Sequence, residues 1–142
     1  MTGRQIINGF HGEYHFLSNF YIEPDGTFVE RDFQAGKATN EYDRQFIESA
    51  STPVEAKRRG RSRAIESRRD WEEVKVDLML RLLRQKFADH PILASKLLAT
   101  GDALLIEGNN WGDRFWGQVN GKGNNMLGIL LHVVRYELVR GA

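Results

Sequence analysis

The amino-acid sequence predicts an α+β fold that is mainly helical and carries a small β-sheet. Several stretches repeat apolar residues at the three- and four-residue spacing of a helix that buries one face. Proline and glycine stand near the starts and ends of these stretches, as they do around helices. Short apolar runs of strand character do not alternate regularly with the helices, which excludes a doubly wound α/β fold. At 142 residues, the chain fits a single domain over residues 1–142 with a core of its own.

The first thirty residues mix aromatic side chains with turn formers and predict short strands. Residues 20–22 and 28–29 are the two predicted strands, and residues 24–26, Pro-Asp-Gly, form the turn between them. Later in the chain, the apolar run 103–107 predicts another strand, and residues 115–119 predict a further one. These segments make up the small sheet.

The predicted helices form the larger part of the fold. The longest covers residues 71–87, begins after a capping box of Asp70 and Glu73, and buries Val74 and Leu78. The others cover, in chain order, residues 29–40, 44–50, 53–60, 91–100 and 124–139. A proline at the first position and a glycine at or just after the end mark the limits of the predicted helices 53–60 and 91–100.

The composition excludes several classes of function. The chain has no cysteine, which rules out disulfide scaffolds, thiolate zinc sites and cysteine nucleophiles. His11 and His15 are spaced like ligands on a helix, but Gly12 argues against a helix there, so no metal is predicted. No apolar run approaches the about 20 residues that cross a bilayer, and the first residues do not resemble a signal peptide. We therefore expect a cytoplasmic protein without membrane association, and the sequence does not indicate its oligomeric state.

One stretch of the chain is strongly basic although the net charge is only +1. Residues 56–71 carry seven cations against two acids, and the cations are Lys57, Arg58, Arg59, Arg61, Arg63, Arg68 and Arg69. A solvated surface of a helix and a loop explains such a run. An edge that recognises phosphate explains it equally well.

A polar stripe lies on the first predicted helix. Glu30, Gln34 and Lys37 are spaced by four and three residues, so at ~100° per residue they fall within roughly 60° of one another. A solvated face explains this stripe, and so does a catalytic one.

A second group of acids and aromatic residues lies near residue 113. Trp116 and Asp113 stand in "WGDRFWG", a segment that resembles a pocket wall more than a core, whereas the place of Trp71 at a helix start favours packing. Glu107 closes an apolar strand. If these acids converge with Glu30 and Lys37, the four side chains together supply the groups that break a bond between a sugar and a base through an oxocarbenium-like state. Alternatively, a desolvated lysine attacks the anomeric carbon and forms a Schiff base.

Eight ordered sequence blocks resemble those of the NADAR family, the YbiA-like proteins. The resemblance extends from residue 9 to about residue 139, and the blocks are "FLSNFY", "VERDFQAGKA", "TPVEAKRRGR", "RRDWEEVKVDLML", "KF", "LLATGDALLIE", "DRFWG" and "GNNMLGILL". It implies a mainly helical, YbiA-like α+β fold and an N-glycosidase without a cofactor. Some members of the family are implicated in cleaving phosphoribosylated intermediates of riboflavin synthesis. Others remove ADP-ribose from guanine bases of nucleic acid.

The resemblance also implies a set of site residues. Glu30 and Lys37 correspond to pocket residues of the family, and Asp113 joins them as the third residue expected to be catalytic. The substrate-binding residues that correspond to family motifs are Ser18, Asn19, Phe20, Asp70, Trp71, Trp116, Gly117, Asn124 and Asn125. Gln34 of the polar stripe and Glu107 at the strand end complete the set, together with Arg61 or Arg69 as the phosphate ligand.

The leading hypothesis is an N-glycosidase that releases ADP-ribose from a guanine base of ADP-ribosylated nucleic acid. Lys37 would be the nucleophile or proton carrier, and Glu30 would orient or activate it. Alternatives are cleavage of a phosphoribosylated small molecule of the riboflavin pathway and a non-catalytic module that binds ADP-ribose or NAD. Family members usually have a histidine and an aromatic residue where this chain has Arg31 and Asp32, and the loop after Gly117 also differs. We expect these departures to bear on substrate choice.

Overall fold

The computed structural model describes residues 3–141, and its fold is mainly helical α+β, as the sequence predicts. The residues cluster into two compact units. We call Asn19–Leu82 the helical unit, and the described residues of Met1–Ser18 and Leu83–Ala142 the mixed unit. The single domain over residues 1–142 stays a prediction.

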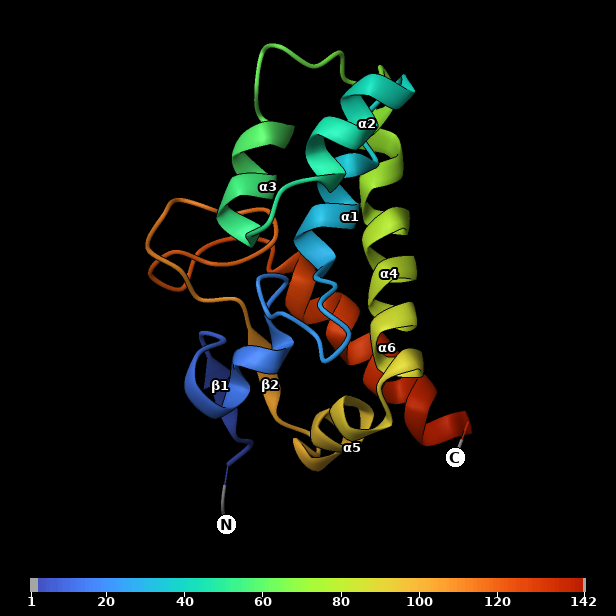
Figure 1. Ribbon diagram of the computed structural model, residues 1–142. Coiled ribbons are helices and arrows are strands. Elements are labelled where there is room, and N and C mark those ends of the chain that lie inside the picture. The colour runs from blue at the N-terminus through green and yellow to red at the C-terminus, as the bar shows by residue number, and fades with distance from the viewer. Residues whose placement is uncertain (1–2, 142) are drawn as a thin grey trace. The chain divides into compact units, whose positions relative to one another are not determined.

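The helical unit is built from α1 (Val29–Ala35), α2 (Glu41–Glu48), α3 (Pro53–Gly60) and the first part of α4 (Trp71–Asp89). Within this unit, α1 packs against both α2 and α3, and α2 also contacts α3 (Figure 1). Small clusters of buried apolar residues lie in it: Phe28 with Ala50 and Ala56, and Ala35 with Ile47 and Ile65. α1 is therefore the central helix of the unit.

Local capping explains where α2 and α3 begin. The Asn40 side chain accepts a hydrogen bond from the amide of Asp43 at 2.8 Å, and the Thr52 hydroxyl accepts one from the amide of Glu55 at 3.2 Å. Pro53 takes the first helical position, where its missing N–H costs nothing. The predicted bounds of α3 are confirmed.

The first helix is shorter than predicted, which corrects the placement of Lys37. α1 ends at Ala35 rather than at residue 40. Asn40 has the extended backbone of an N-cap, and Ala38 forms an antiparallel bridge with Ser67. Because both roles need an extended chain, the helix has to end before them. Lys37 therefore lies just beyond the helix that carries Glu30 and Gln34.

The predicted strands 20–22 and 28–29 are wrong, but the turn between them is confirmed. The amide of Gly26 donates to the Glu23 carbonyl at 2.8 Å, and Gly26 has φ +86°, which glycine adopts readily. The amide of Glu23 donates to the Thr27 carbonyl at 2.8 Å, and α1 begins two residues later. The flanking segments are too short for a ladder before the helix starts.

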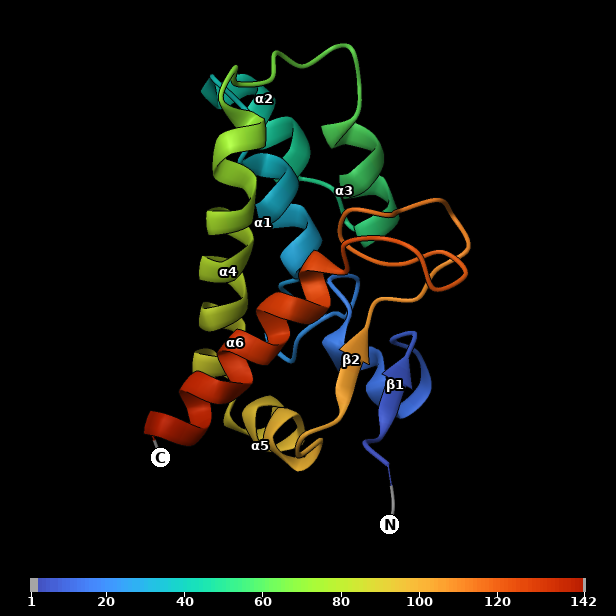
Figure 2. The same cartoon turned by 180° about the vertical axis from the view of Figure 1, so that it is seen from behind.

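The mixed unit contains a parallel pair of strands, β1 (Ile6–Asn8) and β2 (Leu104–Ile106), which lie side by side in Figure 2. It also contains the 3₁₀ helix Gly12–Leu17, α5 (Pro91–Ala99), α6 (Met126–Gly141) and the last part of α4. α6 contacts both β2 and α5. Within residues 3–141, no helix combines the length and the apolar character that a membrane span needs.

The predicted strand 115–119 is also wrong. Only isolated bridges form there, between Gly108 and Gln118 and between Val119 and Lys122. Asn120 and Gly121 connect the second bridge with φ values of +53° and +77°, which is the type of two-residue turn that Asn-Gly favours. β1 was not predicted, because three residues offer little local signal.

Lys86, in the "KF" block, is a buried lysine of α4 that was not among the predicted site residues. Its side chain is 2% exposed, and its Nζ donates to the carbonyls of Phe16 at 2.6 Å and Ser18 at 3.2 Å. The ammonium thus binds the backbone at the end of the 3₁₀ helix, all within the mixed unit.

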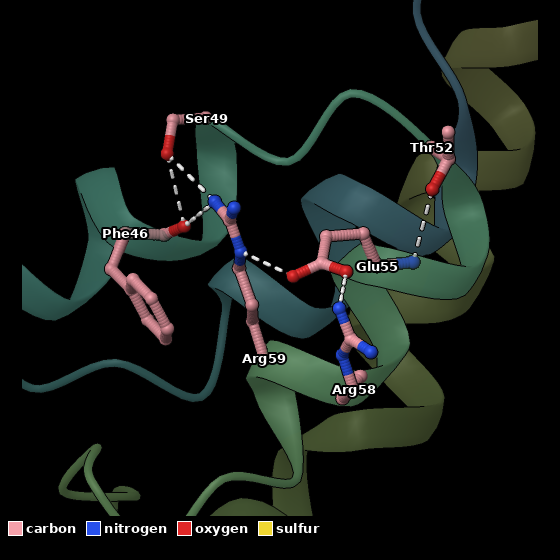
Figure 3. A network of polar contacts seen from close by, with 6 residues as sticks. All are labelled: Phe46, Ser49, Thr52, Glu55, Arg58 and Arg59. Atoms are coloured by element: carbon pink, nitrogen blue, oxygen red, sulfur yellow. Dashed lines mark hydrogen bonds and ion pairs between the residues drawn. The ribbon is translucent and has the colours of Figure 1, made fainter.

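We expect Arg59→Ala to lower the free energy of unfolding by about 1–2 kcal/mol, because Arg59 joins α3 to the end of α2. Its guanidinium donates to the Phe46 carbonyl at 2.7 Å, to Ser49 Oγ at 2.9 Å and to Glu55 at 3.0 Å (Figure 3). Arg58 is a matched control, since its guanidinium pairs with Glu55 and its side chain is 75% exposed against 25% for Arg59. Chemical denaturation measures both variants, and equal stability of the two would contradict this role.

Candidate active site

The centre of the candidate site is a pair of buried polar residues on α1. Gln34 Nε2 donates a hydrogen bond to Glu30 Oε1 at 2.9 Å, and the two side chains are 4% and 6% exposed. The four-residue spacing places them on one face of the helix. Unlike most polar stripes, this one faces the interior of the unit, so the solvated interpretation does not hold for Glu30 and Gln34.

Burial changes the acidity of Glu30. Desolvation raises the pKa of its carboxyl above 4.5, while the hydrogen bond from Gln34 and the charges of Lys57, Lys37 and Arg61 act in the opposite direction. The net direction is upward. A carboxyl group of this kind keeps its proton at a higher pH than an exposed glutamate and can donate it to a leaving group.

Lys37 lies next to this pair, in the turn after α1. Its Nζ donates to the Gly60 carbonyl at 3.2 Å and lies 5.6 Å from the centroid of the Trp71 ring. Burial lowers the pKa of Lys37 below 10.5, and the charges of Arg61 and Lys75 lower it further. The charges of Glu30 and Glu72 raise it. A less basic amine has more of the neutral form that acts as a nucleophile.

Trp71 and Asp70 occupy the start of α4. The Trp71 ring is half-buried and packs against Phe33, with centroids 4.9 Å apart, so the expected packing role holds alongside its contact with Lys37. The predicted capping box does not form. The Asp70 carboxylate instead accepts from Arg68, at 2.6 Å from Nε and 3.0 Å from Nη2.

The basic stretch divides into paired and unpaired cations. Arg58 and Arg59 pair with Glu55, and Arg68 pairs with Asp70. Among the described residues, Arg61, Arg63 and Arg69 form no ion pair. Of these three, Arg61 is the one whose charge acts on both Glu30 and Lys37.

Asn19 lies beside Glu30 in the helical unit, and Phe20 follows Asn19 in the chain. The Asn19 carbonyl accepts from the amide of Glu30 at 3.1 Å. Within residues 3–141, the buried oxygens Asn19 Oδ1 and Gln34 Oε1 have no hydrogen-bond partner. Lys57 Nζ lies 5.7 Å from the centroid of the Phe20 ring. The sequence did not identify Lys57 as a site residue, because nothing local distinguishes it from the other cations of its stretch.

In the mixed unit, the Asp113 carboxylate organises its own loop. Its Oδ1 accepts from the amides of Phe115 at 3.1 Å and Trp116 at 2.9 Å. The Asn109 amide group bonds both the backbone N–H and the carbonyl of Asp113. The Phe115 and Trp116 rings pack edge to face, with centroids 4.9 Å apart. The carboxylate therefore holds the backbone that presents Trp116.

Asn125 connects the start of α6 to β2. Its Oδ1 accepts from the amide of Glu107 and its Nδ2 donates to the Leu105 carbonyl, both at 2.9 Å. Gly117 is buried beside the Glu107 carbonyl, where a Cβ would not fit. Asn124 is exposed and donates its backbone N–H to the Arg114 carbonyl at 2.7 Å. The side-chain oxygen and nitrogen of Asn125 are therefore both hydrogen-bonded to backbone groups of residues 105 and 107.

The predicted site residues therefore fall into two sets. Glu30, Gln34, Lys37 and their neighbours lie together in the helical unit, with Asn19, Phe20, Arg61, Arg69, Asp70 and Trp71 in the same unit. The mixed unit contains Ser18, Glu107, Asp113, Trp116, Gly117, Asn124 and Asn125. The convergence of Glu107 and Asp113 with Glu30 and Lys37 stays a prediction.

Comparison with known proteins identifies relatives over nearly the whole chain. The family model described as the NADAR domain matches residues 9–139. The N-glycosidase YbiA of Shigella boydii is 39% identical over 132 residues, which are 90% of this chain and 82% of the relative. A riboflavin biosynthesis protein of Vibrio vulnificus is 37% identical over 130 residues, which are 87% of this chain but only 35% of that protein.

A solved structure also matches the fold. The NMR structure of Escherichia coli YbiA is 38% identical and superimposes with a TM-score of 0.84. The match covers 99% of this chain and 89% of the solved one. The YbiA-like fold expected from the sequence is therefore confirmed.

Proposed function

The chain belongs to the NADAR domain family, and from this premise we propose that it is an N-glycosidase that cleaves the bond between a ribose or phosphoribose and a base-type amine. The similarity to N-glycosidase YbiA supports this reaction class. The observation that carries the proposal is that two interacting groups of one unit have opposite pKa shifts: burial raises the pKa of Glu30 and lowers that of Lys37. Such opposite shifts within one site match an acid with a nucleophile.

In the proposed mechanism, Lys37 and Glu30 share the proton transfers. The neutral amine of Lys37 attacks the anomeric carbon as the glycosidic C–N bond breaks, and the Glu30 carboxyl gives its proton to the departing nitrogen. The resulting carboxylate then takes a proton from the new ammonium group. Water subsequently hydrolyses the sugar–lysine adduct and frees the amine. Gln34 holds the Glu30 carboxyl in place through their hydrogen bond.

For the substrate, we propose ADP-ribose attached to a guanine base of nucleic acid. Several observations favour a phosphorylated ribose with an attached ring: the positive charges of Lys57 and Arg61 near Glu30, and the half-buried rings of Phe20 and Trp71. The Asp113 carboxylate is proposed to support the ribose, and Trp116 to stack on a ring.

A second candidate substrate is a phosphoribosylated intermediate of riboflavin synthesis, which the name of the Vibrio vulnificus relative favours. A non-catalytic module that binds ADP-ribose or NAD is the remaining alternative. One experiment separates the three. The protein is incubated with guanine-ADP-ribosylated DNA, a phosphoribosylaminopyrimidine and free NAD, and products are identified by mass. Release of ADP-ribose from the DNA supports the leading proposal, and saturable binding without any product would overturn the enzymatic one.

We expect Arg61→Ala to raise KM for a phosphorylated substrate about tenfold, which corresponds to about 1.4 kcal/mol of lost binding, with kcat little changed. Arg61 is the unpaired arginine whose charge reaches both Glu30 and Lys37. Arg69→Ala is the matched control, because Arg69 is also exposed and forms no ion pair among the described residues, whereas the arginine charge that shifts the pKa values of Glu30 and Lys37 is that of Arg61. Steady-state kinetics at constant ionic strength measures both. Equal effects of the two substitutions would assign the loss to general surface charge instead.

A further inference from the structure

Gly60, the last residue of α3, is packed directly against Gln34 of α1. A Cβ atom added to Gly60 would lie 2.7 Å from Gln34 Cδ and 2.8 Å from Gln34 Cβ, and closer still to Oε1. Atoms this close overlap. Rotating the end of the Gln34 side chain relieves the contact with Oε1 but not the one with Cβ, which is attached to the backbone of α1. Any larger residue at position 60 therefore forces α1 and α3 apart.

Backbone conformation does not explain the glycine. Gly60 has no positive φ and ends a helix whose next residue, Arg61, also has helical dihedral angles. Alanine has the higher helix propensity of the two residues. The need for glycine thus comes from the space that Gln34 occupies.

The same residue also contacts Lys37. The Gly60 carbonyl accepts the hydrogen bond from Lys37 Nζ at 3.2 Å. Because Gln34 in turn donates to Glu30, one glycine borders both the residue that orients the proposed acid and the proposed nucleophile. These contacts all lie within the helical unit.

We propose that Gly60 is a positioning residue that sets the relative placement of Glu30 and Lys37 through the close approach of α3 to α1. This inference rests on the proposed function. The Cα of Gly60 lies against the Gln34 side chain, which donates a hydrogen bond to Glu30. The Gly60 carbonyl accepts the hydrogen bond from the Lys37 amine. A displacement of α3 moves the amine away from the carboxyl, and such small misplacements of reacting groups are costly in rate.

The test compares Gly60→Ala with Gly141→Ala. Gly141 is also the last residue of a helix and has no positive φ, and a Cβ there would have nothing within 4 Å. With the best substrate of the product assay, kcat of Gly60→Ala is expected to fall about 100-fold, with KM within about threefold of the wild type. Gly141→Ala should keep the wild-type kcat. A Gly60→Ala variant with wild-type kcat would overturn the inference.

A second pair of variants separates positioning from general damage. Replacing Gln34 with glycine removes the atoms that Gly60→Ala would overlap. In the Q34G background, G60A should therefore cause no further loss of kcat, so that the two effects are strongly non-additive. If the losses multiply instead, Gly60 acts through other contacts and the inference is wrong.

A measurement that does not depend on turnover tests the positioning role of Gly60 separately from the proposed function. The side-chain amide protons of Gln34 are buried against Glu30, so NMR should show slow exchange with solvent in the wild type and in Gly141→Ala. In Gly60→Ala, we expect exchange to be about tenfold faster or more, because an exposed amide loses its protection. Unchanged exchange would overturn the positioning role. Absence of turnover by the wild type would overturn the proposed function alone.

Discussion

Replacing Lys37 with alanine is expected to lower turnover about 10³-fold, in the range found when a positioned proton-transfer group is removed. In the proposed mechanism the Lys37 amine forms the bond to the anomeric carbon, and no other described amine combines its contacts with Gly60 and Trp71. Because the mechanism needs both a neutral Lys37 amine and a protonated Glu30 carboxyl, kcat/KM should follow a bell-shaped pH profile, and the Lys37 limb should report an apparent pKa below 10.5. Single-turnover kinetics across pH measures both effects.

Two further variants sharpen the result for Lys37. Lys37→Arg keeps the positive charge but lacks a nucleophilic amine, so it should be as inactive as the alanine variant if the covalent step is correct. Lys75→Ala is the matched lysine control, because Lys75 lies near Lys37 but pairs with Glu72. The sugar–lysine adduct opens to a Schiff base when the ring oxygen takes the proton of the amine nitrogen, and borohydride should trap this Schiff base on the wild type and on Lys75→Ala only. Wild-type turnover by Lys37→Ala would eliminate the covalent role.

Replacing Glu30 with glutamine is expected to lower turnover about 10²–10⁴-fold and, at neutral pH, to stabilise the fold. The side chains have the same shape, and the glutamine oxygen can still accept the hydrogen bond from Gln34. The loss of activity follows from the missing proton donor. The gain in stability follows from removing a carboxyl that is buried with only partial compensation of its charge.

The pH dependence of the stability gain follows from the direction of the pKa shift. The folded protein holds the Glu30 proton more tightly than the unfolded chain, whose pKa is near 4.5. Ionisation of Glu30 therefore destabilises the folded state as pH rises from about 4.5 through the higher folded pKa. The advantage of Glu30→Gln should be full above the folded pKa and vanish below about pH 4.5.

We would compare the thermal unfolding of wild type and Glu30→Gln at pH values from about one unit below to several units above 4.5, the ordinary glutamate pKa. Glu73→Gln is the control for a change of one charge, since Glu73 is exposed on α4. It should keep full activity. A Glu30→Gln protein that is active, or less stable than the wild type at pH 7, would contradict the assignment of Glu30 as a buried acid.

Local sequence signals were sufficient for most of the helices. The start of α3 follows from Thr52 and Pro53, and each acts through its own backbone and nearest neighbours. The strands were harder. β1 pairs with β2 from almost a hundred residues away in the chain, and such non-local pairing leaves no pattern within three residues. The segments 20–22 and 115–119 have strand-like composition without a partner strand to complete a ladder.

By itself, the sequence determined that Glu30 and Gln34 share one face of a helix, because the spacing of four residues is a property of the helix alone. It also showed the family resemblance that the comparisons confirm. Only the tertiary structure decided that this face is buried, that α1 ends before Lys37, and that the Gly60 carbonyl receives the amine. Burial and the approach of α3 to α1 depend on contacts between residues far apart in the chain, which shift both pKa values and which no local pattern encodes.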